Sequence, residues 1–256
     1  MLEVEGLAKR YGEVVAIRDL SLHLDAGSTL VLLGQNGAGK TTALRCLSGL
    51  LLPTAGRVLV GGRDSALEPD AVRAQVGLVP EVPGLYDRMP ARGYLDFFGR
   101  IYGLDEATRS RRIGRLLELF DLADAGERWL GSFSKGMRQK VALIRATLHR
   151  PPLVLADEPT SALDPDSSRV AWRYLEELRA DGAALVVCTH NLEEAQALAG
   201  EIGIMSGGRL LALGELQQLT RAAGLKKRRE VVERPTLEEV YLAIVGNGAE
   251  DEARPA

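Results

Sequence analysis

Residues 34–41 read Gly34-Gln35-Asn36-Gly37-Ala38-Gly39-Lys40-Thr41. The stretch fits the pattern G-x-x-x-x-G-K-[S/T], and it lies between an aliphatic run at 28–33 and a helical pattern at 39–50. Glycines let backbone N–H groups turn inward around a polyphosphate, and the N-terminus of the following helix adds partial positive charge. A chance glycine turn would not need this strand–loop–helix context. The sequence therefore predicts an α/β fold built around a phosphate-binding loop.

Side chains in and after this loop have distinct expected roles. Lys40 is expected to reach the β- and γ-phosphates of a nucleoside triphosphate, and the Thr41 hydroxyl to ligate Mg²⁺. A second aliphatic run at 153–156 ends in Asp157-Glu158, and the carboxyl ends of parallel strands are where α/β sheets build their sites. We expect Asp157 to hold the Mg²⁺ and Glu158 to polarise the attacking water.

Composition limits the other possibilities. The 256 residues are 46% hydrophobic and 26% charged, which is typical of a soluble globular chain and excludes disorder and collagen-like structure. The formal net charge of −3 gives no global attraction to nucleic acid, so no nucleic-acid partner is expected. Two distant cysteines, Cys46 and Cys188, lie in apolar runs and are expected to be buried thiols. No apolar stretch is long enough to span a bilayer.

Patterning divides the chain into three parts. Short alternating β runs up to about residue 79 predict an N-terminal antiparallel β portion, which joins a mixed sheet with flanking helices. An arginine-rich helical subdomain is expected at about 88–150, its basic faces being solvated rather than aimed at an acidic partner. The main domain is expected to span 1–220. Residues 221–256 are expected to form a charged segment, a short helix begun by a capping box at 236–239, and a flexible tail.

Three further motifs accompany the loop and the acidic strand. They are Phe133-Ser134-Lys135-Gly136-Met137-Arg138-Gln139, Ser161-Ala162-Leu163-Asp164 and Thr189-His190. In this order and spacing the chain resembles, over nearly its whole length, the nucleotide-binding subunit of ABC transporters. Asp164-Pro165 is also a good helix start on its own chemistry, an acidic N-cap followed by proline.

The resemblance implies a role for each motif. Tyr11 would stack on adenine, and the segment Gly34, Gln35, Asn36, Gly37, Ala38, Gly39, Lys40, Thr41 and Thr42 would bind the phosphates of ATP. Ser134, Lys135, Gly136 and Met137 would form the signature motif, which binds the γ-phosphate held by the opposite protomer. Asp164 would connect the two sites. His190 would contact the γ-phosphate and position Glu158, so Glu158, His190 and Lys40 are the expected catalytic residues.

The sequence departs from the usual family pattern at two places. Glu81 aligns with a glutamine that senses Mg²⁺ and faces the permease, and a carboxylate there can still ligate the metal but adds negative charge. The signature has Phe133, Lys135 and Met137 in place of Leu, Gly and Gln, and Lys135 is expected to point to solvent. These departures, with the ending Arg234-Pro235-Thr236-Leu237-Glu238-Glu239-Val240-Tyr241, resemble the branch of sodium-, drug- and copper-associated exporters.

The family resemblance implies a function. The chain would bind Mg-ATP, pair head-to-tail with a second copy or a related subunit around two ATP molecules, and drive a separate integral membrane permease, in the direction of export. It would lie in the cytoplasm on the inner face of the membrane. One alternative is a soluble ABC ATPase of an assembly pathway that has no membrane partner. A phosphate-loop kinase is a second, but it would need no motif at 133–139.

Overall fold

The computed structural model describes residues 1–198, 200–224, 237, 240, 241, 243 and 244. The basic run at 226–229, the capping residues Thr236, Glu238 and Glu239, and the tail after residue 246 therefore lie outside the described residues. Among the described residues, no helix is long and apolar enough to cross a membrane.

Ten strands form one continuous sheet in the order β5-β4-β1-β2-β10-β9-β3-β8-β7-β6. Their bounds are β1 Leu2–Tyr11, β2 Val14–Leu24, β3 Thr29–Leu33, β4 Ala55–Val60, β5 Arg63–Asp64, β6 Val76–Val79, β7 Leu153–Asp157, β8 Ala184–Thr189, β9 Glu201–Ser206 and β10 Arg209–Gly214. Strands β5, β4, β1 and β2 are antiparallel, and β9, β3, β8, β7 and β6 are parallel. The predicted α/β fold with an N-terminal antiparallel portion is confirmed.

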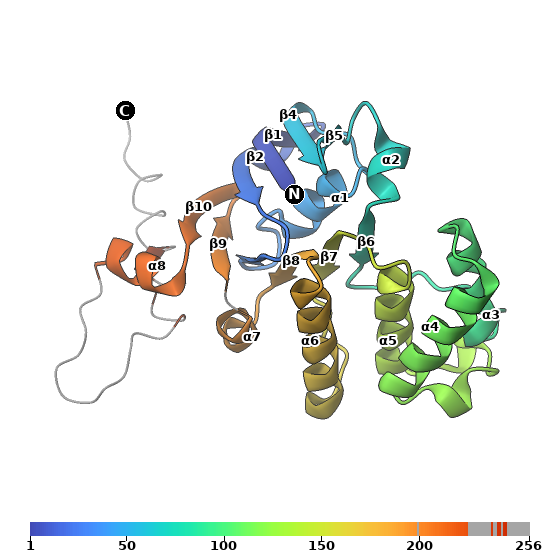
Figure 1. Cartoon of the computed structure of the whole chain (residues 1–256). Helices are drawn as coiled ribbons and strands as arrows, with labels where there is room; N and C mark the ends of the chain where they lie inside the picture. The colour runs from blue at the N-terminus through green and yellow to red at the C-terminus, as the bar shows by residue number, and fades with distance from the viewer. Residues whose placement is uncertain (199, 225–236, 238–239, 242, 245–256) are drawn as a thin grey trace, which may run out of the picture.

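The helices pack on both sides of this sheet. They are α1 Lys40–Leu47, α2 Pro69–Arg73, α3 Ala91–Ile101, α4 Glu106–Leu119, α5 Lys135–Thr147, α6 Pro165–Ala180, α7 Leu192–Ala197 and α8 Leu216–Ala222. Figure 1 shows α1 between the parallel strands and the antiparallel strands, whereas α3, α4, α5 and α6 extend from the opposite side. The phosphate-binding loop thus leaves β3 and enters a helix enclosed by both parts of the sheet.

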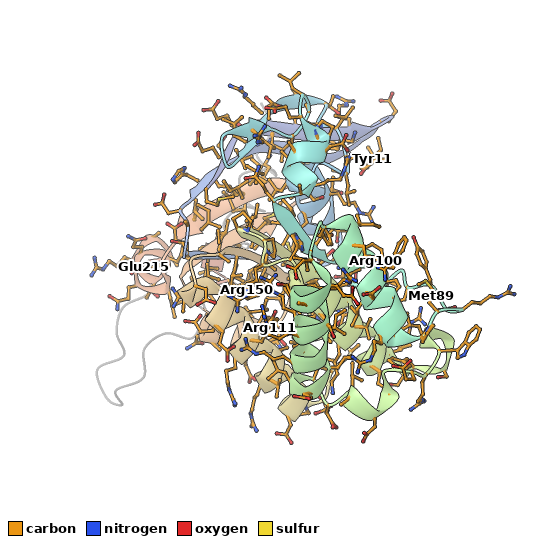
Figure 2. All side chains as sticks on the ribbon, turned by 45° about the vertical axis from the view of Figure 1, so that its right-hand side comes forward. Tyr11, Met89, Arg100, Arg111, Arg150 and Glu215 are labelled. Atoms are coloured by element: carbon orange, nitrogen blue, oxygen red, sulfur yellow. The ribbon has the colours of Figure 1, made fainter. Side chains whose placement is uncertain are left out.

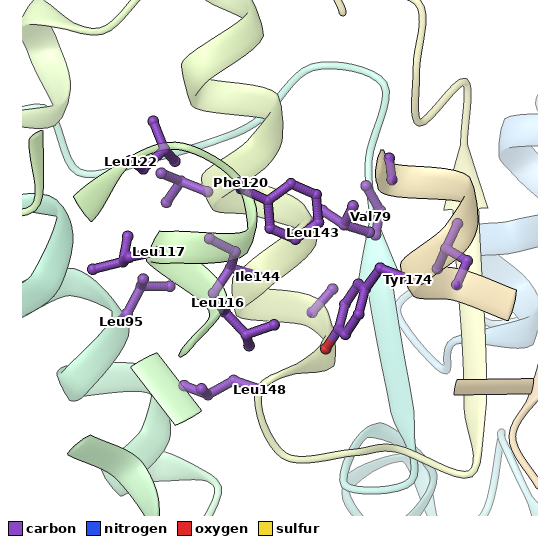
Figure 3. Close-up of a cluster of buried hydrophobic side chains, with 14 of the residues drawn as sticks. Val79, Leu95, Leu116, Leu117, Phe120, Leu122, Leu143, Ile144, Leu148 and Tyr174 are labelled. Carbon is purple, nitrogen blue, oxygen red and sulfur yellow. The ribbon is translucent and has the colours of Figure 1, made fainter. Parts of the chain in front are cut away.

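Side chains of the parallel strands alternate between two cores. On β7, Leu153 and Leu155 join the core under the antiparallel strands, while Val154 and Ala156 face the helical side. This strict alternation follows from the two-residue period of a strand, and it needs both faces covered. On the helical side, residues of α4, α5 and α6 converge around Phe120 and Tyr174 (Figure 3), whose rings meet edge to face with centroids 5.6 Å apart.

The arginine-rich region is a helical subdomain formed by α3, α4 and α5, as the patterning predicts. Its arginines mostly satisfy groups within the chain. Arg109 is buried and pairs with Asp96, and Arg112 donates to the carbonyl of Leu148 at 2.9 Å. Arg111 remains exposed on α4 (Figure 2). Arg109 and Arg112 are thus accounted for by contacts within the chain, and Arg111 by exposure to solvent.

On α6, the face that packs on the core is centred on Ala171, Tyr174 and Leu175, so the adjacent Val170 is half-buried. The short helix α2 and the two-residue strand β5 carry no clear sequence pattern and were not predicted. Both cysteines are buried as expected, and burial raises the pKa of the Cys46 thiol to about 11.

Candidate functional site

The loop after β3 is shaped by glycines that no other residue can replace without a clash. A Cβ atom on Gly34 would lie 2.4 Å from the carbonyl oxygen of Met205, and one on Gly39 would lie 2.5 Å from that of Ala16. Gly39 also has φ of 101°, a left-handed conformation that disfavours side chains. The loop is therefore pressed against β9 and β2, and its backbone must turn inward.

Lys40 lies inside this loop, although its ammonium group is charged. The side chain is buried, and Nζ donates to the carbonyl oxygens of Gly34 at 2.5 Å and of Gln35 at 3.3 Å. A buried charge needs such partners, because desolvation without compensation is costly. The ammonium is thus held at the centre of the loop, where an anion would meet it.

A cavity of about 290 Å³ lies over the loop. It is lined by Val14, Val15, Ala16, every residue from Gln35 to Thr42, Glu81, Asp157 and Glu158. The start of β2 and the segments that follow β3, β6 and β7 thus meet at one place, although they are far apart in the sequence. A smaller hollow of about 130 Å³ is lined by Thr41, Glu81 and Asp157 among others.

Asp157 and the residues around it have the composition of a divalent-cation site. Burial raises the pKa of the Asp157 carboxyl; the Thr41 hydroxyl opposes this shift, the charges of Glu81 and Glu158 reinforce it, and Lys40 opposes it. Thr41 and Asp157 supply the hard oxygen ligands that Mg²⁺ prefers, and a cation would relieve the repulsion from the charges of Glu81 and Glu158. In the part of the chain that the structure describes, no three His, Cys, Asp or Glu side chains are grouped so that they could hold a metal by themselves. The residues present therefore fit Mg²⁺, with Thr41, Asp157 and Glu81 as the candidate ligands.

Glu158 is held in an unusual backbone conformation directly after β7. Its φ is 47°, in the left-handed region that non-glycine residues rarely adopt. Its N–H donates to the carbonyl of Cys188 at 2.9 Å, and its own carbonyl accepts from the Ser161 N–H at 3.2 Å. Strain of this kind persists only where the surroundings enforce it, and it is common at functional sites.

His190 contacts the Glu158 side chain. Its Nδ1 lies 2.7 Å from Oε1 of Glu158. Because an ionised carboxylate only accepts hydrogen bonds, Nδ1 carries the proton of this pair and Nε2 is left to face outward. The imidazole is 59% exposed, whereas the carboxylate is only 8% exposed, so the histidine forms the solvent-facing side of the pair.

The signature residues are not brought to the loop within this chain. Ser134 caps α5 by accepting from the Met137 N–H at 3.2 Å, and Lys135 is exposed, as expected. A Cβ on Gly136 would lie 2.9 Å from the carbonyl of Ala162, so the signature packs on the 161–164 segment. Among the described residues that line the 290 Å³ cavity, none comes from 133–139.

Asp164 and Tyr11 lie outside the lining of the 290 Å³ cavity. Asp164 caps α6 by accepting from the N–H of Ser167 at 2.9 Å, which confirms the predicted helix start. Tyr11 ends β1 and is 45% exposed, with the Lys9 ammonium 5.3 Å from its ring centroid. Figure 2 shows it beside the antiparallel strands, and it does not line the cavity, although Val14, three residues later, does.

One side chain that contacts this site has no distinctive signal in the sequence. Glu194, on α7, accepts from the hydroxyls of Thr160 and Thr189, which flank Glu158 and His190. Its signal in the sequence is its place in the first turn of a helix, three residues after the N-cap Asn191. Such a spacing is equally typical of a helix-capping residue, so the sequence gives no reason to prefer a site contact.

Comparison with known proteins agrees with this arrangement. Residues 17–161 match the family model described as ABC transporter. Over 207 residues the chain is 41% identical to the ABC transporter ATP-binding protein NatA of Bacillus subtilis (strain 168), covering 80% of this chain and 84% of that protein. It is 36% identical over 219 residues to the Nod factor export ATP-binding protein I of Ralstonia nicotianae (strain ATCC BAA-1114 / GMI1000), covering 86% and 68%.

Two solved structures show the same fold. An ATP-binding subunit of an ABC transporter has a TM-score of 0.88 and 33% identity, covering 96% of this chain and 99% of that one. A dimeric post-hydrolysis state of the ATP-binding cassette MJ0796, bound to ADP and Pi, has a TM-score of 0.78 and 25% identity, covering 84% and 99%. The chain therefore belongs to the ABC transporter family, as an ATP-binding subunit that hydrolyses ATP.

Proposed function

We propose that this subunit hydrolyses ATP as one half of a head-to-tail dimer and drives a separate membrane permease, in the direction of export, from the inner face of the membrane. The observation that carries the ATP site is the convergence of Lys40, Asp157 and Glu158 on one cavity above the glycine loop. The names of relatives, one of them an export protein, support the direction.

In this proposal Lys40 and the inward N–H groups of the loop hold the β- and γ-phosphates. Glu158 orients the attacking water and accepts its proton. His190 acts in this step as an imidazolium, which donates from Nδ1 to Oε1 of Glu158 and from Nε2 to the γ-phosphate. A Mg²⁺ ion held by Thr41 and Asp157, with Glu81 beside them, would supply charge neutralisation for the phosphates. Tyr11 would cover the adenine.

The dimer is supported by the separation of two halves of the expected site. Ser134, Gly136 and Asp164 lie on the surface near one another, away from the loop cavity of their own chain. A second copy rotated by two-fold symmetry can present its signature to this chain's loop and receive this chain's signature in return. The dimeric cassette with ADP and Pi, to which this fold is similar, is consistent with such a pair.

A permease partner is supported by an exposed apolar patch beside the Glu81 loop. Phe97 and Ile101, one turn apart on α3, are 42% and 61% exposed, and Tyr86 packs on Phe97 with ring centroids 6.4 Å apart. We call Tyr86, Phe97 and Ile101 the aromatic patch. Exposed aromatic clusters of this kind mark protein contacts, and a short amphipathic helix of a permease's cytoplasmic loop fits one.

The aromatic patch packs on residues that also contact β6, and Tyr86 lies on Tyr94 with ring centroids 5.6 Å apart. Beneath it, the Tyr94 hydroxyl accepts from Arg145 at 2.9 Å, and the Arg145 guanidinium lies 5.4 Å from the Phe98 ring centroid. Arg145 also donates to the carbonyl of Leu78 on β6, at 3.5 Å. Because β6 leads directly to Glu81, a displacement of the aromatic patch by a partner would be passed through contacting side chains to the lining of the cavity.

Affinity capture of the tagged chain from detergent-solubilised membranes of the source organism tests the partner. We expect a multi-spanning membrane protein to be recovered with the wild type and with Arg111→Ala, and to be lost with Phe97→Asp, which charges the patch. ATPase activity of the isolated Phe97→Asp chain should be retained. Recovery of soluble assembly proteins alone, with the same dependence on Phe97, would replace the transporter role with the assembly role.

The Glu81→Gln variant tests the departure from the family pattern. Burial is the main cause of the raised pKa of Asp157, and removing the Glu81 carboxylate lowers the repulsion that adds to it, while an amide oxygen still ligates Mg²⁺. We expect turnover at saturating Mg²⁺ to stay within about threefold of the wild type, because the general base is untouched. Titration of ATPase activity with Mg²⁺ checks this. Complete inactivation would show that the Glu81 carboxylate has an essential role of its own.

A further inference from the structure

The Glu194 carboxylate bridges the two chain segments that carry Glu158 and His190. Oε1 accepts from the Thr160 hydroxyl, two residues after Glu158, and Oε2 accepts from the Thr189 hydroxyl at 3.2 Å, one residue before His190. Both threonines are buried, at 3% and 0% exposed. Buried hydroxyls need partners, and here one side chain supplies an acceptor to both.

The Thr189 hydroxyl has two carboxylates within reach but only one proton to give. Its Oγ1 lies 3.2 Å from Oε2 of Glu194 and 3.4 Å from Oε2 of Glu158. A hydroxyl donates a single hydrogen bond, so these two contacts compete. The same Oγ1 accepts from the Asn191 N–H at 2.9 Å, which fixes its position between the two acids.

Helix capping does not account for the Glu194 side chain. Asn191 is the N-cap of α7, and Glu194 stands at the third helical position, where an acidic side chain commonly bonds back to the N-cap N–H. Here that N–H is already satisfied by Thr189, while Asn191 Oδ1 accepts from the N–H groups of Glu193 and Glu194 at 3.0 and 3.3 Å. The backbone of Glu194 is fixed, and its carboxylate turns to the two threonines.

We propose that Glu194 is a positioning residue for ATP hydrolysis: it takes the Thr189 proton and thereby leaves Oε2 of Glu158 free for the attacking water. The inference rests on the proposed role of Glu158. With His190 bound to Oε1 and Thr189 diverted to Glu194, one oxygen of Glu158 keeps an open acceptor site. Without Glu194, the Thr189 hydroxyl donates to Oε2 of Glu158, occupies one of the two acceptor sites of that oxygen and makes the carboxylate a weaker base toward the water. The Thr160 contact meanwhile holds the segment after Glu158 against β8.

Steady-state kinetics with Mg-ATP tests this. Glu194→Ala is expected to lower kcat about tenfold and to change KM less than about twofold, because the lost interaction acts on the water and not on the bound nucleotide. The double variant Glu194→Ala/Thr189→Val should have a kcat at least threefold higher than that of Glu194→Ala, because the competing hydroxyl is gone. Glu193→Ala, an exposed neighbour on the same helix, is the control and should match the wild type.

The variants distinguish the role of Glu194 from the role of Glu158. Unchanged kcat in a folded Glu194→Ala chain, or a loss that Thr189→Val does not relieve, would overturn the positioning role. If Glu194→Ala does not fold, Glu194→Leu keeps a side chain of similar size that accepts no hydrogen bond, and it takes the place of Glu194→Ala in both measurements. Glu158→Gln is run alongside: if that variant keeps normal turnover, the role of Glu158 fails first, whereas a stalled Glu158→Gln beside a normal Glu194→Ala rejects the role of Glu194 alone.

Discussion

Glu158→Gln is expected to bind ATP as tightly as the wild type and to lose at least about 100-fold in turnover, the size of effect that a general base contributes. The reason is local. The amide keeps the shape of the side chain, and its oxygen still accepts from His190 Nδ1 at the position of Oε1. It has no capacity to take the proton of the attacking water. The phosphate loop, with Lys40 at its centre, is unaltered.

Stalled hydrolysis should also make the dimer visible. If ATP holds two copies together and its cleavage releases them, Glu158→Gln with Mg-ATP should elute from size-exclusion chromatography at twice the monomer mass, and at the monomer mass without ATP. Glu118→Gln, an exposed change on α4, makes the same chemical substitution and should show wild-type turnover. Wild-type hydrolysis by Glu158→Gln would remove Glu158 as the base. A stalled monomer would keep the base and remove the dimer.

Local signals in the sequence predicted the elements that carry the site. The strand–loop–helix at 28–50 and the acidic strand at 153–157 lie where the pattern placed them, because each is encoded by consecutive residues and its own turn chemistry. The cap at Asp164 is equally local: its carboxylate accepts from a residue three positions on. Predictions of this kind need no knowledge of what packs against the segment.

Features that depend on long-range pairing were not predictable in the same way. The two parts of the sheet join through β10 and β2, at the parallel pair Arg209 and Asp19, which are 190 residues apart in the chain. Arg109 was expected to be solvated with its neighbours, yet it is buried against Asp96. In both cases the partner is set by tertiary packing, which the periodicity of a single segment does not encode.

The same limit applies within the site. Glu158 adopts φ of 47°, and nothing in Asp157-Glu158-Pro159 requires it; the conformation follows from the contact with Cys188 on the next strand. Glu194 resembles a capping residue until the position of Thr160 is known. The motifs thus predicted Lys40, Asp157 and Glu158, which line the cavity over the loop, whereas the contacts that orient Glu158 are visible only once the strands are side by side.

Lys40→Ala is expected to weaken ATP binding by about ten- to a hundredfold, which corresponds to the loss of a charged hydrogen bond of about 1.5–3 kcal/mol. Lys40 is held inside the loop by the carbonyls of Gly34 and Gln35, so its ammonium is already desolvated and placed for the phosphates. Removing it deletes the central side-chain charge of the loop and leaves those two carbonyls without their donor.

Equilibrium binding of a fluorescent ATP analogue, measured without Mg²⁺ and then with it, checks the effect on Lys40→Ala. Arg111→Ala removes the same charge from an exposed position on α4 (Figure 2). It should bind ATP within about twofold of the wild type, because salt screens exposed surface charges. Thermal unfolding of both variants without nucleotide controls for the fold. Unchanged ATP affinity in a folded Lys40→Ala chain would mean that the backbone N–H groups bind the phosphates alone, and the assignment of Lys40 would be wrong.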